Sequence, residues 1–299
     1  MENKAMDKKD LGVIIAAYIL ILVMAVFFQA QKFYFWEENM KFSYFKPWLS
    51  PWLAGVAKFS PKALGKETCQ CKCPADAPTA VKKEIGAPFT ILIAGDSFVN
   101  GGVGVELERA LLGCVSTTVY RTSKPSTGLS RRDYFDWREE IKELLALRQP
   151  NVVYVMFGAN DGQGIPLEGN KAVYYGTPEW DSLYFSRVSE FMDILSKENV
   201  EVFWIGNPIA RSSDYREKME KLNSIYASSS AKYENIKFIS LWETLKDSKG
   251  NYSDYLPDNK GVMRLARESD GIHVTDFGGI ITSKEIILKV QQVIPLACP

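Results

Sequence analysis

Short apolar runs alternate with longer segments of helical periodicity between residues 90 and 293. The runs are rich in β-branched and aromatic residues, which predicts strands at 90–95, 116–121, 152–158, 200–206 and 236–242. Apolar residues recur near a 3.6-residue spacing at 104–112, 134–147, 183–197, 214–233 and 276–293, which predicts helices. Nearly continuous apolar strands separated by helices predict a three-layer α/β/α sandwich around a parallel five-stranded sheet.

Polar residues follow two of the predicted strands, and in parallel sheets the loops after strands form binding sites. Ser97 directly follows the first strand. A serine at a strand-to-helix turn can present its hydroxyl and its own N–H to one space, which suits a nucleophile and half an oxyanion hole. Asn160 follows the third strand, and its amide can donate to a developing oxyanion. Each segment taken alone is also an ordinary turn sequence.

His273 is the only histidine among the 299 residues. A serine hydrolase that needs an imidazole base therefore has one candidate. Asp270 lies three residues earlier, and in a turn this spacing can bring its carboxylate to Nδ1 of the imidazole. The alternative for an isolated segment of this kind is a solvated loop histidine.

Together these segments resemble the conserved blocks of the SGNH (GDSL-type) hydrolase superfamily. The matching blocks are Gly95-Asp96-Ser97, Gly158-Ala159-Asn160-Asp161 and Asp270-Gly271-Ile272-His273, in that order. The resemblance covers about residues 88–299 and implies a flavodoxin-like fold, with Phe98 standing where many members carry Leu. It implies a triad of Ser97, His273 and Asp270. It also implies an oxyanion hole formed by the N–H groups of Ser97 and Gly128 and the side chain of Asn160.

Residues 127–137 also look like a largely uncharacterised bacterial branch that has a periplasmic SGNH domain behind one amino-terminal hydrophobic segment. The expected function is a serine esterase, without a cofactor, that removes acetyl or other short acyl groups from cell-envelope carbohydrate. One alternative is O-acyltransfer with the same triad, served by an acyl-donor partner protein in the membrane. Another is a catalytically silent glycan-binding or assembly module, because fold does not fix function.

A possible glycan site involves five further residues near these loops. They are Arg131, Arg132, Tyr174, Tyr175 and Trp180. Such side chains can bind an extended glycan through stacking and charge, although surface residues of these types are often solvated or packed locally.

An uncharged run of 18 residues, 11–28, precedes the predicted domain. As a helix it is about 27 Å long, close to the thickness of a bilayer core. We therefore predict a cytoplasmic tail at 1–10, a transmembrane anchor at 11–30, and an aromatic juxtamembrane segment with a tether at 31–87. The bulky Phe28 disfavours signal-peptide cleavage. The flanking lysines do not decide the topology, but the short tail favours a single pass through the cytoplasmic membrane, with the domain at 88–299 on the periplasmic side.

Charge and cysteine content restrict the partners. Lys plus Arg and Asp plus Glu both number 36, so no basic excess favours nucleic acid. The cluster of Cys69, Cys71 and Cys73 lacks the C-x-x-C spacing of zinc sites, and we expect no metal. One of the three is expected to pair with Cys298, whereas Cys114 is interpreted as a buried small hydrophobic residue. The odd cysteine count leaves the pairing open.

Overall fold

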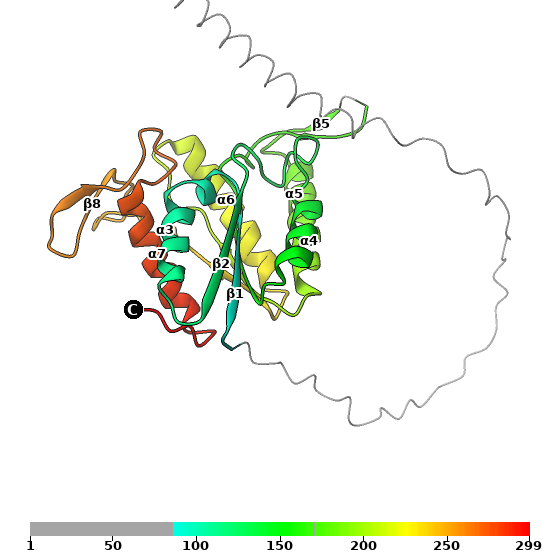
Figure 1. The fold of residues 1–299 in the computed structure, drawn as a ribbon. Helices are drawn as coiled ribbons and strands as arrows, with labels where there is room; N and C mark the ends of the chain where they lie inside the picture. Colours follow the sequence, from blue (N-terminus) through cyan, green and yellow to red (C-terminus); the bar gives the residue numbers. More distant parts are fainter. Residues whose placement is uncertain (1–85, 170) are drawn as a thin grey trace, which may run out of the picture. The chain divides into compact units, whose positions relative to one another are not determined.

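The computed structural model describes residues 86–299 except Asn170, so the predicted tail, anchor and nearly all of the tether lie outside the described residues. The domain is built on a parallel five-stranded sheet with the strand order β2-β1-β3-β6-β7 (Figure 1). The strands are β1 (Phe89–Gly95), β2 (Thr117–Ser123), β3 (Val152–Met156), β6 (Glu201–Ile205) and β7 (Ile236–Ile239). All five predicted strands are present, and none of their ends shifts by more than three residues.

Helices cover both faces of the sheet (Figure 1). The helix pair α3 (Gly102–Leu112) and α7 (Asp276–Val290) lies on one face. The helices α4 (Trp137–Arg148), α5 (Pro178–Ser196) and α6 (Ser213–Ser230) pack on the other side, with α6 also reaching the edge strand β7. The predicted parallel sheet between helical layers is thereby confirmed.

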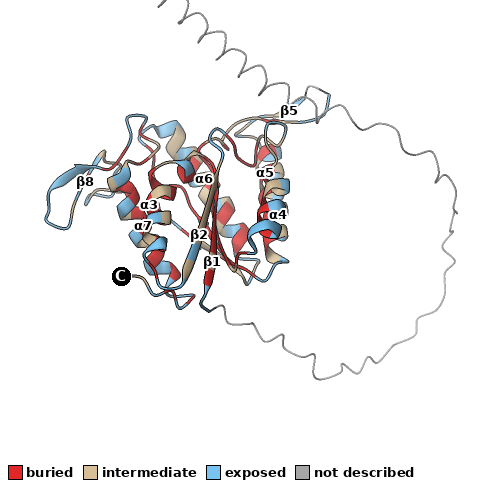
Figure 2. Ribbon diagram, in the orientation of Figure 1, coloured by how far each residue is buried: buried red, intermediate tan, exposed pale blue. Residues whose placement is uncertain are grey.

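The strands β1, β3 and β6 are almost entirely buried because helices cover both faces of the sheet, whereas the edge strand β2 carries polar residues and is only partly buried (Figure 2). Successive residues of a strand point to opposite faces. In β1, Ile91 and Ile93 therefore join the core under α3 and α7, whereas Leu92 and Ala94 join the core under α4 and α5. This double burial explains why the sequence shows continuous apolar runs and not an alternation of apolar and polar residues.

Three small features were not among the predicted elements. The one-turn helix α2 (Ser97–Asn100) follows β1 directly. Two short antiparallel hairpins are formed by β4 (Ile165–Pro166) with β5 (Ala172–Val173) and by β8 (Tyr255–Pro257) with β9 (Met263–Leu265). Within the described part of the chain, no helix is long and apolar enough to cross a membrane.

The carboxyl-terminal segment returns to the amino-terminal edge of the sheet. The N–H of Val115 donates to the carbonyl of Ala297 at 2.8 Å, and Cys114 forms a disulfide with Cys298. The expected pairing of Cys298 with the cluster at residues 69–73 is therefore wrong, as is the interpretation of Cys114 as an unpaired hydrophobic residue. The physical reason is that the segment after α7 passes beside the end of α3, where Cys114 lies.

Candidate active site

Ser97, His273 and Asp270 form one continuous series of hydrogen bonds. Ser97 Oγ lies 2.7 Å from His273 Nε2, and His273 Nδ1 lies 2.6 Å from Asp270 Oδ2. Ser97 is 176 residues away from His273 in sequence, so the fold itself creates this contact. The arrangement can pass a proton from the serine hydroxyl to the imidazole while the carboxylate fixes the orientation of the ring.

The turn that carries Ser97 is held by the residues on either side of it. Asp96 caps α2, and its Oδ1 accepts a hydrogen bond from the N–H of Phe98 at 2.9 Å. Gly95 ends β1 so close to β3 that a Cβ would collide with the carbonyl oxygen of Met156. Glycine is therefore required there, and the chain can turn sharply at the carboxyl end of the strand.

The turn that carries His273 is organised by Asp270. Asp270 Oδ1 accepts from the N–H groups of Ile272 at 2.8 Å and His273 at 3.0 Å, which leaves Oδ2 for the imidazole. Burial raises the pKa of the Asp270 carboxyl, but the hydrogen bonds from the His273 side chain and these N–H groups outweigh it, and the net pKa lies below the ordinary value. Asp270 is therefore a carboxylate at neutral pH. Gly271, between them, adopts a φ of 71°, which favours glycine.

The Gly128 loop and the Asn160 turn lie against each other at the same sheet edge. Asn160 Nδ2 donates to the carbonyl of Thr127 at 3.2 Å. The N–H of Ser130 donates to Asp161 Oδ1 at 2.7 Å, and the Ser130 hydroxyl donates to the Asp161 carbonyl at 2.7 Å. These contacts bring Gly128 and Asn160 into neighbouring turns.

Asp96 connects the Asn160 turn to the Ser97 turn. Asp96 Oδ2 accepts from the N–H groups of Gly158 and Ala159, each at 3.0 Å. In the sequence, Asp96 and Asp161 are noted only as members of the matching motifs. In the structure both are fully buried: Asp96 joins the Ser97 turn to the Asn160 turn, and Asp161 joins the Asn160 turn to the Gly128 loop. The signal that could have identified Asp96 is a carboxylate placed directly after a mostly apolar strand.

Burial raises the pKa of both buried aspartates. The pKa of Asp96 rises to about 7, because desolvation and the nearby Asp161 outweigh the three N–H donors. The pKa of Asp161 rises to about 6, again because desolvation outweighs the hydrogen bonds from Ser130 and its neighbours. The floor of the site therefore contains two coupled groups that titrate near neutral pH.

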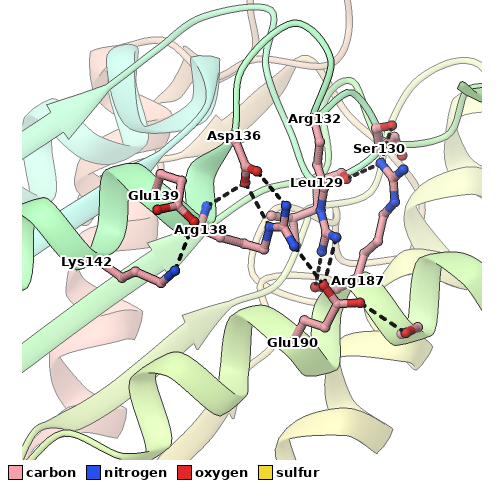
Figure 3. A network of polar contacts seen from close by, with 10 residues as sticks. Leu129, Ser130, Arg132, Asp136, Arg138, Glu139, Lys142, Arg187 and Glu190 are labelled. Atoms are coloured by element: carbon pink, nitrogen blue, oxygen red, sulfur yellow. Dashed lines mark hydrogen bonds and ion pairs between the residues drawn. The ribbon is translucent and has the colours of Figure 1, made fainter. Parts of the chain in front are cut away.

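A network of charged side chains flanks the Gly128 loop (Figure 3). Arg187 on α5 donates from Nη1 to the carbonyl oxygens of Leu129 at 3.0 Å and Ser130 at 2.7 Å. Arg132 donates to Glu190 Oε2 at 2.8 Å and to the carbonyl of Arg187. The guanidinium of Arg132, one of the predicted glycan contacts, is thus engaged on α5.

The other predicted glycan contacts differ in how far they are exposed. Arg131 pairs with Asp133 on the surface, and Tyr174 is largely exposed. Tyr175 packs against the edge of Trp180. Trp180 is fully buried, stacks on Tyr184 and donates from Nε1 to the carbonyl of Gln163 at 2.6 Å. Its predicted role as a surface stacking platform is therefore corrected, because no ring face is available to a ligand.

A small pocket of about 240 Å³ opens beside Asn160. Its lining residues are Gly158, Ala159, Asn160, Gly162, Gln163, Tyr215 and Lys218. The amides, the phenol and the ammonium make the lining largely polar, which suits a small polar group more than a long acyl chain. In residues 86–299, no group of three or more His, Cys, Asp or Glu side chains is placed to hold a metal ion.

Comparisons with known proteins give a family and a fold. A family model described as "Protein of unknown function (DUF459)" matches residues 90–289. A catalytic mutant of an acetylxylan esterase from Geobacillus stearothermophilus is 14% identical with a TM-score of 0.52, over 69% of this chain and 96% of the esterase. An alpha/beta hydrolase enzyme from the metagenome of Lake Arreo, Spain, is 14% identical with a TM-score of 0.50, over 68% and 95%.

A GDSL-like lipase from Bacteroides thetaiotaomicron is 14% identical with a TM-score of 0.47, and the match covers 69% of this chain and 90% of the lipase. A comparison with curated proteins finds no match. At these identities the likeness to solved structures concerns the fold alone, and the chemistry must be argued from the residues of this chain.

Proposed function

This chain belongs to the DUF459 family and has the fold of the SGNH (GDSL-type) hydrolases, and on that basis we propose that it is a serine esterase. The observation that carries the proposal is the continuous series of hydrogen bonds from Ser97 through His273 to Asp270, at 2.7 and 2.6 Å. A nucleophile, a base and an orienting carboxylate in this order are what ester hydrolysis requires.

In the proposed reaction, Ser97 Oγ bonds to the ester carbonyl carbon while its proton moves to His273 Nε2. The developing oxyanion accepts hydrogen bonds from the N–H groups of Ser97 and Gly128 and from the Asn160 amide. The protonated imidazole then gives its proton to the leaving alcohol, and an acyl group remains on Ser97. His273 then takes a proton from water, whose oxygen bonds to the acyl carbon. As the bond from this carbon to Ser97 Oγ breaks, His273 returns the proton to Oγ, which releases the acid and restores the free serine.

The substrate we propose is an acetyl or other short acyl ester on cell-envelope carbohydrate. Two features support it. The pocket beside Asn160 is small and polar, and the predicted anchor at residues 11–30 would hold the domain at the outer side of the cytoplasmic membrane. Acyl transfer would need water to be kept from the acyl-enzyme. The side chains of His273 and Asp270 are 28% and 44% exposed, so water can reach the site, which favours hydrolysis over transfer. A silent binding module would have no use for the complete Ser97–His273–Asp270 relay.

The test measures turnover of 4-nitrophenyl acetate and covalent labelling by a fluorophosphonate probe. We expect Ser97→Ala and His273→Ala each to remove most of the turnover, and Asp270→Asn to impair it severely, because the three act as one unit. The Ser97→Ala/His273→Ala double variant should be scarcely worse than either single variant. Ser186→Ala, a serine on the exposed side of α5, is the matched control. A folded wild-type protein that is not labelled at Ser97 would refute the proposal and favour the silent module.

A further inference from the structure

Two arginines are buried next to the loops that carry the proposed catalytic groups. Arg267 is 1% exposed and Arg187 is 9% exposed. The hydrogen bonds of both guanidinium groups go to main-chain carbonyl oxygens. Burying a cation among neutral acceptors carries a desolvation cost, so these positions call for a physical explanation.

Arg267 lies behind the loop that carries His273. Its Nη1 donates to the carbonyl of Ile209 at 2.7 Å, and its Nη2 donates to the carbonyl of Ile272 at 2.8 Å. Its Nε lies 3.4 Å from the carbonyl of His273, and its guanidinium stands 4.8 Å from the centre of the Tyr252 ring. Burial lowers its pKa to about 10, so it remains a cation at neutral pH. One rigid group therefore joins the His273 loop to the loop after β6.

Arg187 holds the Gly128 loop in a similar way from α5 (Figure 3). Its Nη1 donates to the carbonyl oxygens of Leu129 and Ser130, the two residues that follow Gly128. Asp161 holds the same loop from the other side by accepting from the Ser130 N–H at 2.7 Å. The loop is thus fixed between a buried cation and a buried carboxyl group, which restricts the direction of the Gly128 N–H.

The Arg267 guanidinium reaches carbonyl oxygens of two loops through two different nitrogens, whereas Arg187 reaches two successive carbonyl oxygens through Nη1 alone. Loop carbonyl oxygens have no partner in a strand ladder or a helix, so their positions depend on side-chain donors. The guanidinium presents its N–H groups in a fixed plane, whereas a lysine ammonium is a single point of charge on a flexible chain. A lysine at position 267 would keep the charge and lose the two separately directed donors.

We propose that Arg267 and Arg187 are positioning residues of the active site, Arg267 for the His273 base and Arg187 for the Gly128 oxyanion donor. This inference rests on the proposed esterase function. Because one arginine positions the base and the other positions an oxyanion donor, the kinetic consequences of replacing them should differ.

Arg267→Met is expected to lower kcat for 4-nitrophenyl acetate roughly 10- to 100-fold, because a small displacement of a catalytic group can have this effect. It should also shift the pH at half-maximal activity upward. Removing a buried cation near the imidazole favours the protonated ring, so a higher pH is needed to free the base. The charged and titratable groups around Arg267 are Tyr252, Asp270, Asp254 and Arg211. Arg267→Lys should lose kcat without this pH shift.

Arg187→Met should lower kcat by a similar factor, roughly 10- to 100-fold, with KM changed by no more than about twofold, because the oxyanion is bound only in the transition state. Its pH at half-maximal activity should stay that of the wild type. It should also slow fluorophosphonate labelling of Ser97, since the tetrahedral phosphonate adduct uses the same donors.

Matched controls separate positioning from loss of stability. Arg138→Met removes an arginine that donates to Asp136 and Glu190 beside Arg187 and makes no bond to the Gly128 loop. Arg264→Met removes an exposed arginine that pairs with Asp258, three residues before Arg267. Both controls should keep wild-type kcat and pH profile in the full chain. Unfolding free energies from urea titration would be measured for every variant.

Three outcomes would overturn the inference. The first is equal kcat and pH profiles for the Arg267, Arg187 and control variants. The second is a loss of activity that follows only the fraction of unfolded protein. The third is failure of both Arg267→Met and Arg267→Lys to fold, which would make this arginine a determinant of stability. If wild-type protein has no esterase activity and no labelling, it is the proposed function that fails, which is distinguishable from all three.

Discussion

At the residue scale, Asp96 and Asp161 couple the site to pH without taking part in the proposed proton relay. Both lie in the floor of the site, and both have pKa values raised by burial, to about 7 and about 6. A carboxyl group whose pKa is raised in the folded state binds its proton more tightly there than in the unfolded chain. Its contribution to stability is complete below about pH 4 and is lost as the pH rises through the folded pKa.

We therefore predict that the free energy of unfolding falls between about pH 4 and pH 7, with a slope of up to about 1.4 kcal/mol per pH unit from Asp96. Urea unfolding of the purified chain at pH 5, 6 and 7 measures it. Asp96→Asn should be less stable, because its single amide oxygen cannot replace both Oδ2, which accepts from Gly158 and Ala159, and Oδ1, which accepts from Phe98. Its slope should also be flatter. A slope unchanged by Asp96→Asn would assign the pH dependence to other groups. Carboxylates with lowered pKa, such as Asp270, act below this window.

Gly128 gives a second prediction at this scale. A Cβ at Gly128 would collide with the Asp161 carboxylate, so Gly128→Ala must push the loop away from its buried anchor. We expect kcat for 4-nitrophenyl acetate to fall about 100-fold, within the range reported for loss of one oxyanion donor. Gly164→Ala is the control, since its Cβ would meet only ordinary contacts at 3.7 Å. Near-wild-type turnover by Gly128→Ala would remove this glycine from the proposed oxyanion hole.

The sequence predicted the residues that perform the proposed chemistry, but it did not predict the residues that position them. Ser97, Asn160 and His273 stand at strand ends or in a unique position, so their types and places suffice to select them. Arg187 contacts Ser130, which lies 57 residues away in the sequence. Arg267 contacts the carbonyl of His273, which lies 6 residues away. Nothing in their local sequence distinguishes them from arginines on the surface, because their role depends on burial in the folded domain.

At the element scale, periodicity predicted the strands and long helices because both faces of the sheet are buried. The hairpins β4–β5 and β8–β9 escaped prediction because their strands are two or three residues long, too short to show a period. In β9, the exposed Met263 and Leu265 flank the exposed Arg264, so no buried face produces a recognisable pattern. The disulfide partner of Cys298 could not be chosen from spacing, because the pairing depends on where the segment after α7 returns.

This disulfide gives a prediction for the end of α3 and the carboxyl-terminal segment. Cys114 and Cys298 are 184 residues apart, so the bond closes most of the domain into a loop. Without a reductant, Cys114→Ser and Cys298→Ser should each lower the free energy of unfolding by about 2–5 kcal/mol. The two effects should be equal, because each variant removes the same disulfide. Addition of a reductant should destabilise the wild type alone. Peptide mapping without reduction would contradict the structure if it joined Cys298 to residues 69–73.

At the scale of the whole molecule, we predict that the full-length chain stays with membranes after alkaline carbonate washing. As a membrane-spanning helix, the 18 uncharged residues at 11–28 would bury enough apolar surface for stable insertion. A variant without residues 11–28 should be released into the wash and should keep its esterase activity. Recovery of a soluble wild-type form that begins near Gln31 would show cleavage. Full protection of the domain from protease added to spheroplasts would reverse the proposed topology.

The direction of β1 has a practical consequence for the whole domain. Phe89 opens this strand next to Ser116, close to where the carboxyl-terminal segment meets Val115, while Ser97 follows the far end of the strand. Seven residues of strand span about 23 Å. Both ends of the domain therefore lie on the side away from the nucleophile and are suitable attachment points. A fusion partner or a surface linkage joined before Gly86 or after Pro299 should leave the mouth of the site free to meet a bulky polymer.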